Sequence, residues 1–451
     1  MKRDMTNGKE WKLILLFTLP IIAGNLLQQL YNIIDGIVVG NFVSELAFAS
    51  VTTCTSLTVL YLCIATGLSV GVSVITSQYY GAGKKEDLPV AIDTAVILLG
   101  ICGLAVSVIG VLLSPFLLEN VLNVPEENLP QSILYMRIYS AGLFFQFIYN
   151  GIAATLRGFG DSKATLYFLL IATLLNTGLD LLFVISFRWS VAGAAYATVL
   201  AQFICVVVSY IYLRKRFPVV KGGRHWDGRI AATMAKLGLP IAVQFGVVAI
   251  GGGSMQRLVN GFDATVPGIV AAYGAGIRLD NLVFVLILGF QSGLVSFTGQ
   301  NIGAGRIDRV KRGLYSTLVM SLSATIIMSV VFFLNAEAVV SFFGLEAGSL
   351  QIGSEIVRFM CFFFWLFSAY QSLGGVLQGA GDTILTSFAT LSGLAFRITF
   401  AYVTVNLGLI DHSAAWVSHP LSWTWSSIIV CIRYFSGRWK NKAVAGELKR
   451  G

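Results

Sequence analysis

Three carboxylates, Asp35, Asp180 and Asp280, lie inside long apolar segments of this sequence. Nearly all the other acidic residues fall in predicted loops or near the ends of apolar segments. An ionisable side chain at membrane depth is costly, and by default it marks a pathway for an ion or a substrate. These residues therefore predict that a proton or a small cation binds inside a membrane.

A polar stripe leads to Asp35. Asn25, Gln28 and Asn32 precede it at intervals of three, four and three residues. This spacing places all four side chains on one face of a helix. Amide side chains alone can serve simply to join helices through hydrogen bonds. A carboxylate on the same face is not explained in that way, so we interpret the stripe as part of an ion or substrate site.

Two later segments carry residues with the same period. Asn176 and Asp180 are four residues apart, and so are Ala194 and Thr198. Two carboxylates in a common apolar interior, Asp35 and Asp180, cannot both remain ionised cheaply. One of them then holds a proton at neutral pH, or Na⁺ supplies the compensating charge. Oxygen ligands for Na⁺ would come from Asp35, Asn176, Asp180 and Thr198, together with backbone carbonyl groups.

The second half of the sequence carries different charges at the matching places. Arg397 and Ala401 stand where the first half has its amide and its acid. Arg278 and Asp280 are two residues apart, so they do not share a helix face. Two interpretations stay open, namely an Arg397–Asp280 ion pair that Gln291 could join, and a role in transport.

These charges belong to a sequence that contains the same pattern twice. Residues 156–162 (Leu-Arg-Gly-Phe-Gly-Asp-Ser) return 221 residues later as 377–383 (Leu-Gln-Gly-Ala-Gly-Asp-Thr). The segments resemble phosphate-binding loops, but they lack the preceding strand that would support that reading. We interpret them as turns, in which glycine ends one helix and Asp161 or Asp382 caps the next.

The elements that position these residues are long apolar runs. Only 12% of the residues are charged and 56% are hydrophobic, and each run can cross a hydrocarbon core of about 30 Å as a helix. The sequence thus predicts an all-α polytopic membrane protein. Twelve transmembrane helices are expected at 13–38, 48–77, 91–114, 132–155, 165–187, 191–213, 237–260, 268–298, 314–335, 352–376, 384–406 and 413–435. Gly67 and Gly71 form a small-xxx-small pattern, which lets helix backbones approach closely.

The longest polar stretch separates two sets of six predicted helices. We expect an N-terminal lobe at 1–213, a cytoplasmic linker at 214–236 and a C-terminal lobe at 237–451. With the N-terminus inside, most of the 31 Lys and Arg residues lie in inside segments, and Arg188 lies in an outside loop. This asymmetry predicts that both termini are cytoplasmic. An even number of spans makes the two lobes enter the membrane in the same direction, as parallel repeats related by a pseudo-twofold axis.

The net charge of +9 follows from this asymmetry and does not indicate nucleic-acid binding. The six cysteines lie in or at the edges of apolar segments, with the spacing of neither a zinc site nor a disulfide framework. We expect a monomer in the plasma membrane without a cofactor, whose partners are the lipid bilayer and small organic cations.

The chain resembles the multidrug and toxic compound extrusion (MATE) transporters over essentially its full length. The segments that carry the resemblance are 19–20, 28–35, 156–162, 176–180, 193–202 and 300–305. It implies two six-helix lobes around a central cleft that opens alternately to each side and exports organic cations in exchange for H⁺ or Na⁺. In prokaryotic relatives with a cation site in the N-terminal lobe, the matching positions are Asp35, Asn176, Asp180, Ala194 and Thr198.

The resemblance also bears on other residues. Pro20 matches a proline whose helix bends when the cation site changes protonation. Relatives with acids in the C-terminal lobe have a Glu where this chain has Val248, which favours coupling through the first lobe. Candidates for a substrate cleft are Gln28, Asn32, Tyr149, Arg278, Asp280, Gln291 and Arg397.

Two other functions have to be compared with the features of this sequence. A lipid-linked oligosaccharide flippase of the same superfamily needs a basic cavity, which Arg278 and Arg397 permit and the acids of the first lobe argue against. A membrane-embedded transferase needs a catalytic loop at the interface. Because the loops here are short, we expect that the protein is not an enzyme.

Overall fold

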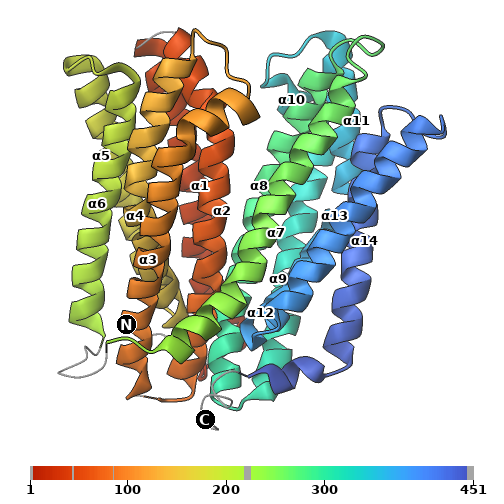
Figure 1. The fold of residues 1–451 in the computed structure, drawn as a ribbon. Coiled ribbons are helices and arrows are strands. Elements are labelled where there is room, and N and C mark those ends of the chain that lie inside the picture. Colours follow the sequence, from red (N-terminus) through yellow and green to blue (C-terminus); the bar gives the residue numbers. More distant parts are fainter. Residues whose placement is uncertain (1–3, 43–44, 85, 218–224, 444–451) are drawn as a thin grey trace. The chain divides into compact units, whose positions relative to one another are not determined.

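The computed structural model describes residues 4–42, 45–84, 86–217 and 225–443, and it describes side chains except at 30–48. Throughout these residues the chain forms helices and contains no β-strand (Figure 1). The predicted all-α class is therefore confirmed. Each predicted span coincides with one long helix or with two helices in succession.

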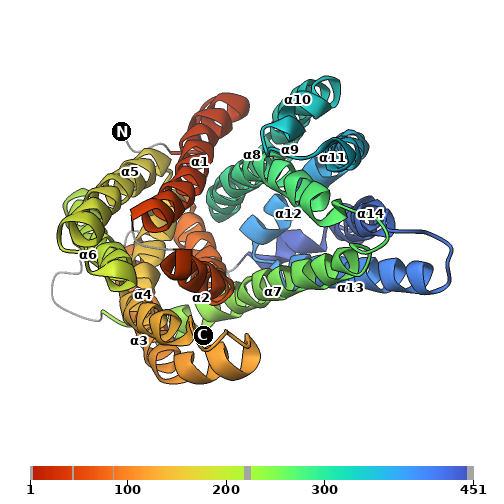
Figure 2. The ribbon, with the colours of Figure 1, turned by 90° about the horizontal axis from the view of Figure 1, so that it is seen from above.

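The first half of the chain forms six long helices. They are α1 (Glu10–Phe42), α2 (Glu45–Gly81), α3 (Asp87–Phe116), α4 (Leu129–Gly158), α5 (Ser162–Asp180) and α6 (Ser190–Arg216). Two π-helical turns, η1 (Leu117–Val121) and η2 (Leu181–Ser186), continue α3 and α5. Within this half, α4 packs against α2, α3 and α6, and α5 lies beside α6 (Figure 2).

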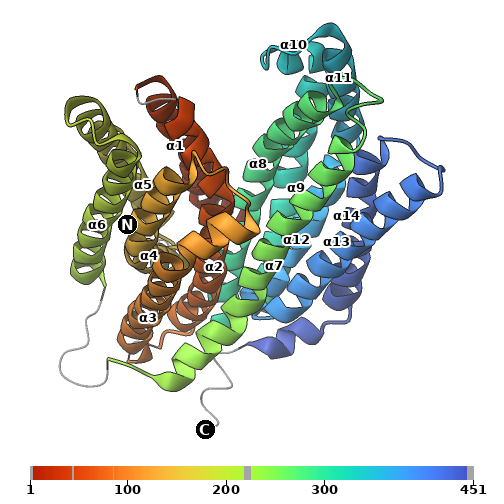
Figure 3. The same cartoon turned by 45° about the horizontal axis from the view of Figure 1, so that its top comes forward.

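The second half repeats this pattern with one span broken. Its helices are α7 (Gly228–Asn260), α8 (Ile269–Gly303), α9 (Ile307–Leu334), α10 (Ala336–Ser341), α11 (Ala347–Cys361), α12 (Phe364–Ala380), α13 (Thr383–Asn406) and α14 (Ala414–Phe435). A 3₁₀ turn, η3 (Arg438–Lys442), follows. Within this half, α8 packs against α9, α11 and α12, and α13 lies beside α14 (Figure 3).

Ten elements of the described chain are long and apolar enough to cross a membrane. Nine are single helices, and the tenth is the pair α11–α12, which is bent by 47°. The other two predicted spans, α4 and α14, are long enough but less apolar. Helix α4 packs against three helices of its half, so its buried face can carry the hydroxyl groups of Ser132 and Ser140. The chain is a multi-pass membrane protein.

The packing of the chain defines two compact units, which we call lobe 1 and lobe 2. Lobe 1 contains Leu19–Ala242, and lobe 2 contains Met5–Thr18 and Val243–Glu447. Helices α1 and α7 therefore each begin in one lobe and continue in the other, and each changes lobe within a few residues of an internal proline, Pro20 or Pro240. The predicted boundaries at the 214–236 linker stay a prediction.

The start of the described chain packs into lobe 2. Met5 is fully buried, and its backbone N–H donates to Gln300 Oε1 at 2.9 Å. Asn301 Nδ2 donates to the Met5 carbonyl oxygen at 3.2 Å, and Arg309 pairs with Glu10 at 3.1 Å. Gln300 and Asn301, at the end of α8, thus anchor the residues that precede α1.

The two repeated Gly-x-Gly-Asp turns differ in what their acids bind. Asp161 caps α5 as predicted, because it accepts from the Ala164 N–H at 3.2 Å, and it also accepts from the Tyr212 hydroxyl at 2.7 Å. The expected cap by Asp382 is wrong, since that side chain makes no capping bond to α13. It pairs instead with Arg433 at 2.6 Å, which draws the carboxylate toward α14.

Gly67 and Gly71 bring α2 against the first turns of α7 inside lobe 1. A Cβ atom on Gly67 would lie 2.2 Å from the Cα atom of Ala242. One on Gly71 would lie 2.1 Å from the carbonyl oxygen of Met234. Only glycine permits this approach, so the predicted role of this small-xxx-small pattern is confirmed.

Candidate functional site

The structure brings four of the predicted ion-site residues together in lobe 1, between α5 and α6. Asn176 and Asp180 lie one turn apart on α5 and are 3% and 1% exposed. Ala194 is buried and Thr198 is half-buried on α6. The four-residue spacing on each helix turns both pairs toward the neighbouring helix, as the sequence period requires.

Hydrogen bonds fix the arrangement of these side chains. With the Asn176 amide oriented so that both of its polar atoms have suitable partners, Nδ2 donates to Asp180 Oδ2 at 2.9 Å and the amide oxygen accepts from the Thr198 N–H at 3.1 Å. The Thr198 hydroxyl donates to the Ala194 carbonyl oxygen at 3.1 Å. Immediately after Asp180 the chain widens into the π-helical turn η2, a feature frequent at functional sites.

This arrangement has the chemistry to bind a proton or a small hard cation. Asp180 supplies a negative charge, while Asn176, Thr198 and the Ala194 carbonyl group supply neutral oxygen atoms. Within the part of the chain that the structure describes, no three His, Cys, Asp or Glu residues gather. A single described carboxylate among neutral oxygen atoms suits a monovalent ion better than a divalent one.

The predicted contributions of α1 are only partly visible. Asp35 and Asn32 lie outside the residues whose side chains are described, although α1 runs through both positions. Gln28 is half-buried on α1, and Pro20 lies inside the same helix. The roles predicted for these four residues stay predictions.

The remaining cleft candidates are divided between the two lobes. In lobe 1, the Tyr149 hydroxyl donates to the Thr165 carbonyl oxygen at 3.5 Å. In lobe 2, Gln291 accepts from Gln371 Nε2 at 3.5 Å. Arg278 is exposed and lies 5.7 Å from the ring centre of Phe343, on a different face of α8 from the buried Asp280.

A second buried polar cluster occupies lobe 2. Arg397 on α13 is 8% exposed, and Asp280 on α8 is 4% exposed. The two interact through their charges, but the described residues include no ion pair between them within 4.0 Å. A direct pair, which was one of the two interpretations of these charges, is therefore not formed between these described residues, and a role in transport stays a prediction. Arg397 Nη2 instead donates to the Ala415 carbonyl oxygen at 3.3 Å, and the Tyr273 hydroxyl group interacts with the same guanidinium group.

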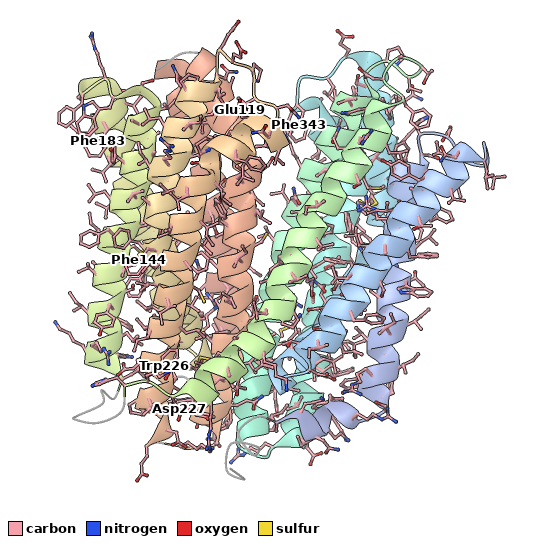
Figure 4. All side chains as sticks on the ribbon, in the orientation of Figure 1. Glu119, Phe144, Phe183, Trp226, Asp227 and Phe343 are labelled. Carbon is pink, nitrogen blue, oxygen red and sulfur yellow. The ribbon has the colours of Figure 1, made fainter. Side chains whose placement is uncertain are left out.

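A buried acid at one end of lobe 1 was not predicted from the sequence. Asp93 on α3 is 2% exposed, and Arg214 and His225 each approach its carboxylate to 2.6 Å. The Asp227 N–H donates to Thr94 at 3.0 Å, where α7 begins (Figure 4). The predicted linker is thus bound to α3 at its first residue and near its middle. The sequence did contain a signal for this contact: an acid two residues inside a predicted span, together with basic residues in the linker.

Comparison with known proteins agrees with this architecture. The MatE family model matches residues 20–182 and 240–403, one match in each half. The chain is 28% identical to the probable multidrug resistance protein YpnP of Bacillus subtilis (strain 168), over 97% of both chains. It is 24% identical to the FAD transporter of Shewanella oneidensis, over 75% of this chain and 76% of that one.

A solved structure has the same fold. It is a MOP superfamily transporter from Pyrococcus furiosus, with a TM-score of 0.87 and 22% identity, covering 97% of this chain and 98% of that one. A transporter fold over essentially the whole length, and a family model that matches both halves, leave one assignment: the chain belongs to the MatE family, the multidrug and toxic compound extrusion transporters.

Proposed function

We propose that the protein is a secondary active exporter of the cell membrane, which exchanges organic, mostly cationic compounds for H⁺ or Na⁺. The observation that carries this proposal is the buried carboxylate of Asp180, held by Asn176 beside the Thr198 and Ala194 oxygen atoms. The relationship to multidrug resistance proteins supports the same substrate class.

The physical reason for coupling lies in the cost of a buried charge. Keeping the Asp180 carboxylate ionised in a low-dielectric interior costs several kcal/mol, and a bound H⁺ or Na⁺ reduces that cost. Ion binding therefore favours conformations in which Asp180 stays buried, and ion release favours those that hydrate it. An ion and an organic cation that use the same negative charge exclude each other, which produces exchange rather than co-transport.

The proposal includes the orientation and state of the chain. Both termini lie in the cytoplasm, because the Lys and Arg residues concentrate on that side of the predicted spans. The protein acts as a monomer, Asp35 contributes a second carboxylate to the ion site, and no cofactor takes part.

An anionic substrate is the second candidate. It is favoured by the FAD transporter among the relatives and by the two arginines of lobe 2, the exposed Arg278 and the buried Arg397. FAD carries a negatively charged pyrophosphate group, which arginine binds well. A lipid-linked oligosaccharide carries the same group, so a flippase would show the same preference.

Transport by everted membrane vesicles tests the proposal. A pH gradient and a Na⁺ gradient are imposed separately, and uptake is measured for a fluorescent organic cation and for FAD. We expect one gradient to drive uptake of the cation. Uptake of FAD alone, or accumulation of lipid-linked intermediates in cells that lack the protein, would contradict the cation-exporter proposal.

A further inference from the structure

The two lobes correspond residue by residue beyond the repeated turns. Asp161 and Tyr212, which are 51 residues apart, have their counterpart in Asp382 and Arg433, again 51 residues apart. A second pair of equivalent hydrogen bonds joins residues that are 37 apart. Cys205 donates to the Phe168 carbonyl oxygen in lobe 1, and Ser426 donates to the Ala389 carbonyl oxygen in lobe 2. The offset between the lobes is 221 residues at each of these positions.

The same offset locates the counterpart of the lobe 1 ion site. Arg397 corresponds to Asn176, and Ala401 corresponds to Asp180. Ala415 corresponds to Ala194, and His419 corresponds to Thr198. Lobe 2 thus lacks the acid that lobe 1 carries on α5, and it has a cation on the equivalent helix, α13. Both replacements reverse the charge that the site offers to an incoming ion.

The guanidinium group of Arg397 binds where an ion ligand is expected. Arg397 Nη2 donates to the Ala415 carbonyl oxygen at 3.3 Å, and this oxygen corresponds to that of Ala194. The Tyr273 hydroxyl group on α8 interacts with the same guanidinium group. The positive charge of Arg397 is therefore bound by a backbone oxygen atom of α14 and lies near a hydroxyl group of α8.

The compensating negative charge comes from α8. Asp280 is 4% exposed, and within the described chain it makes no hydrogen bond and no ion pair within 4.0 Å. Its interaction is with the charge of Arg397. A buried carboxylate is tolerated only where another charge compensates it. Arg397 therefore compensates the charge of Asp280 as a bound ion would compensate the charge of Asp180.

We propose that Arg397 is a resident cation, a side chain that permanently occupies the lobe 2 counterpart of the ion site. Lobe 2 then binds no coupling ion, and only lobe 1 responds to an ion gradient. The identification of the counterpart rests on the proposed function of the Asp180 site. The occupancy of lobe 2 itself is testable without transport.

The resident-cation proposal differs from a purely structural role in one respect. A side chain needed only for packing cannot be replaced by a free ion, whereas a cation site emptied by truncation can be refilled. Arg397→Ala removes the guanidinium group and leaves Asp280, the Ala415 carbonyl oxygen and Tyr273 in place. Free guanidinium ion is the matching probe.

Binding of radiolabelled guanidinium to the purified protein in lipid nanodiscs tests this. An Asp35→Asn/Asp180→Asn background removes both acids proposed for the lobe 1 ion site. We expect no saturable binding in that background, saturable binding with a higher melting temperature after Arg397→Ala is added, and affinity at least about tenfold weaker when Asp280→Asn is added as well. Equal binding with and without Asp280, or no binding by a folded Arg397→Ala protein, would overturn the proposal.

A second pair of variants serves if Arg397→Ala does not fold. Arg397→Lys keeps a cation and should fold and bind no guanidinium, while Arg397→Gln leaves Asp280 without its compensating charge and should yield less folded protein. Equal yields of folded Lys and Gln variants would refute the proposal. Retained gradient-driven transport in Asp180→Asn alone would instead refute the proposed function and leave the lobe 2 result standing.

Discussion

The contrast between the two Gly-x-Gly-Asp turns predicts unequal effects of equivalent substitutions. Arg433→Gln removes the cation that Asp382 binds at 2.6 Å. Tyr212→Phe removes the hydroxyl group that donates a hydrogen bond to Asp161 at 2.7 Å. The two positions correspond in the repeat, so each substitution is the matched control of the other.

The burial and the remaining partners set the magnitudes. The Asp382 side chain is 6% exposed and that of Arg433 is 19% exposed, so removing the cation leaves a buried carboxylate, at a cost of about 3 kcal/mol. Asp161 keeps its bond from the Ala164 N–H, so loss of the hydroxyl should cost about 1.5 kcal/mol. Adding Asp382→Asn to Arg433→Gln removes the stranded charge and should recover most of the loss.

Equilibrium unfolding in sodium dodecyl sulfate measures these differences in the free energy of unfolding. We expect Arg433→Gln to destabilise about twice as much as Tyr212→Phe, and the Asp382→Asn/Arg433→Gln double variant to be more stable than Arg433→Gln alone. Equal losses of unfolding free energy in the two single variants, or additive losses in the double variant, would refute the reasoning. They would show that the buried charge of Asp382 is not the main cause of the destabilisation.

Two further substitutions test the packing of lobe 1. Arg214→Gln should lower the melting temperature markedly, by a loss of about 2–3 kcal/mol, because it removes a cation from the buried Asp93. The exposed Lys215→Gln is its control, and an equal effect of the two would contradict this. Gly71→Ala should reduce the yield of folded protein, because its Cβ atom would lie 2.1 Å from a carbonyl oxygen of α7. Gly252→Ala should be tolerated, because its Cβ atom would have no neighbour within 4 Å. A lower yield for Gly252→Ala than for Gly71→Ala would show that α2 and α7 are not tightly packed at Gly71.

The sequence predicted the features that depend on local pattern. Apolar runs determined the helices, because a chain in lipid has to satisfy its backbone hydrogen bonds within each segment. The four-residue spacing of Asn176 and Asp180 predicted their shared face, and their neighbours on α6 followed from the same period.

Features that depend on distant partners were not predicted. Asp93 is buried because Arg214 and His225 reach it from more than a hundred positions away, and no local period records this. Asp382 has the same local sequence as a capping acid, but the residue opposite it on α14 is an arginine rather than a tyrosine. A repeated motif therefore indicated a shared backbone and left the side-chain partners undetermined.

The central claim is that the carboxylate of Asp180 couples transport to an ion. It is tested most directly by Asp180→Asn in proteoliposomes, with gradient-driven export and gradient-free exchange of the same organic cation measured in parallel. The account predicts that the folded variant loses accumulation against a gradient of H⁺ or Na⁺. Accumulation at the wild-type level would contradict it.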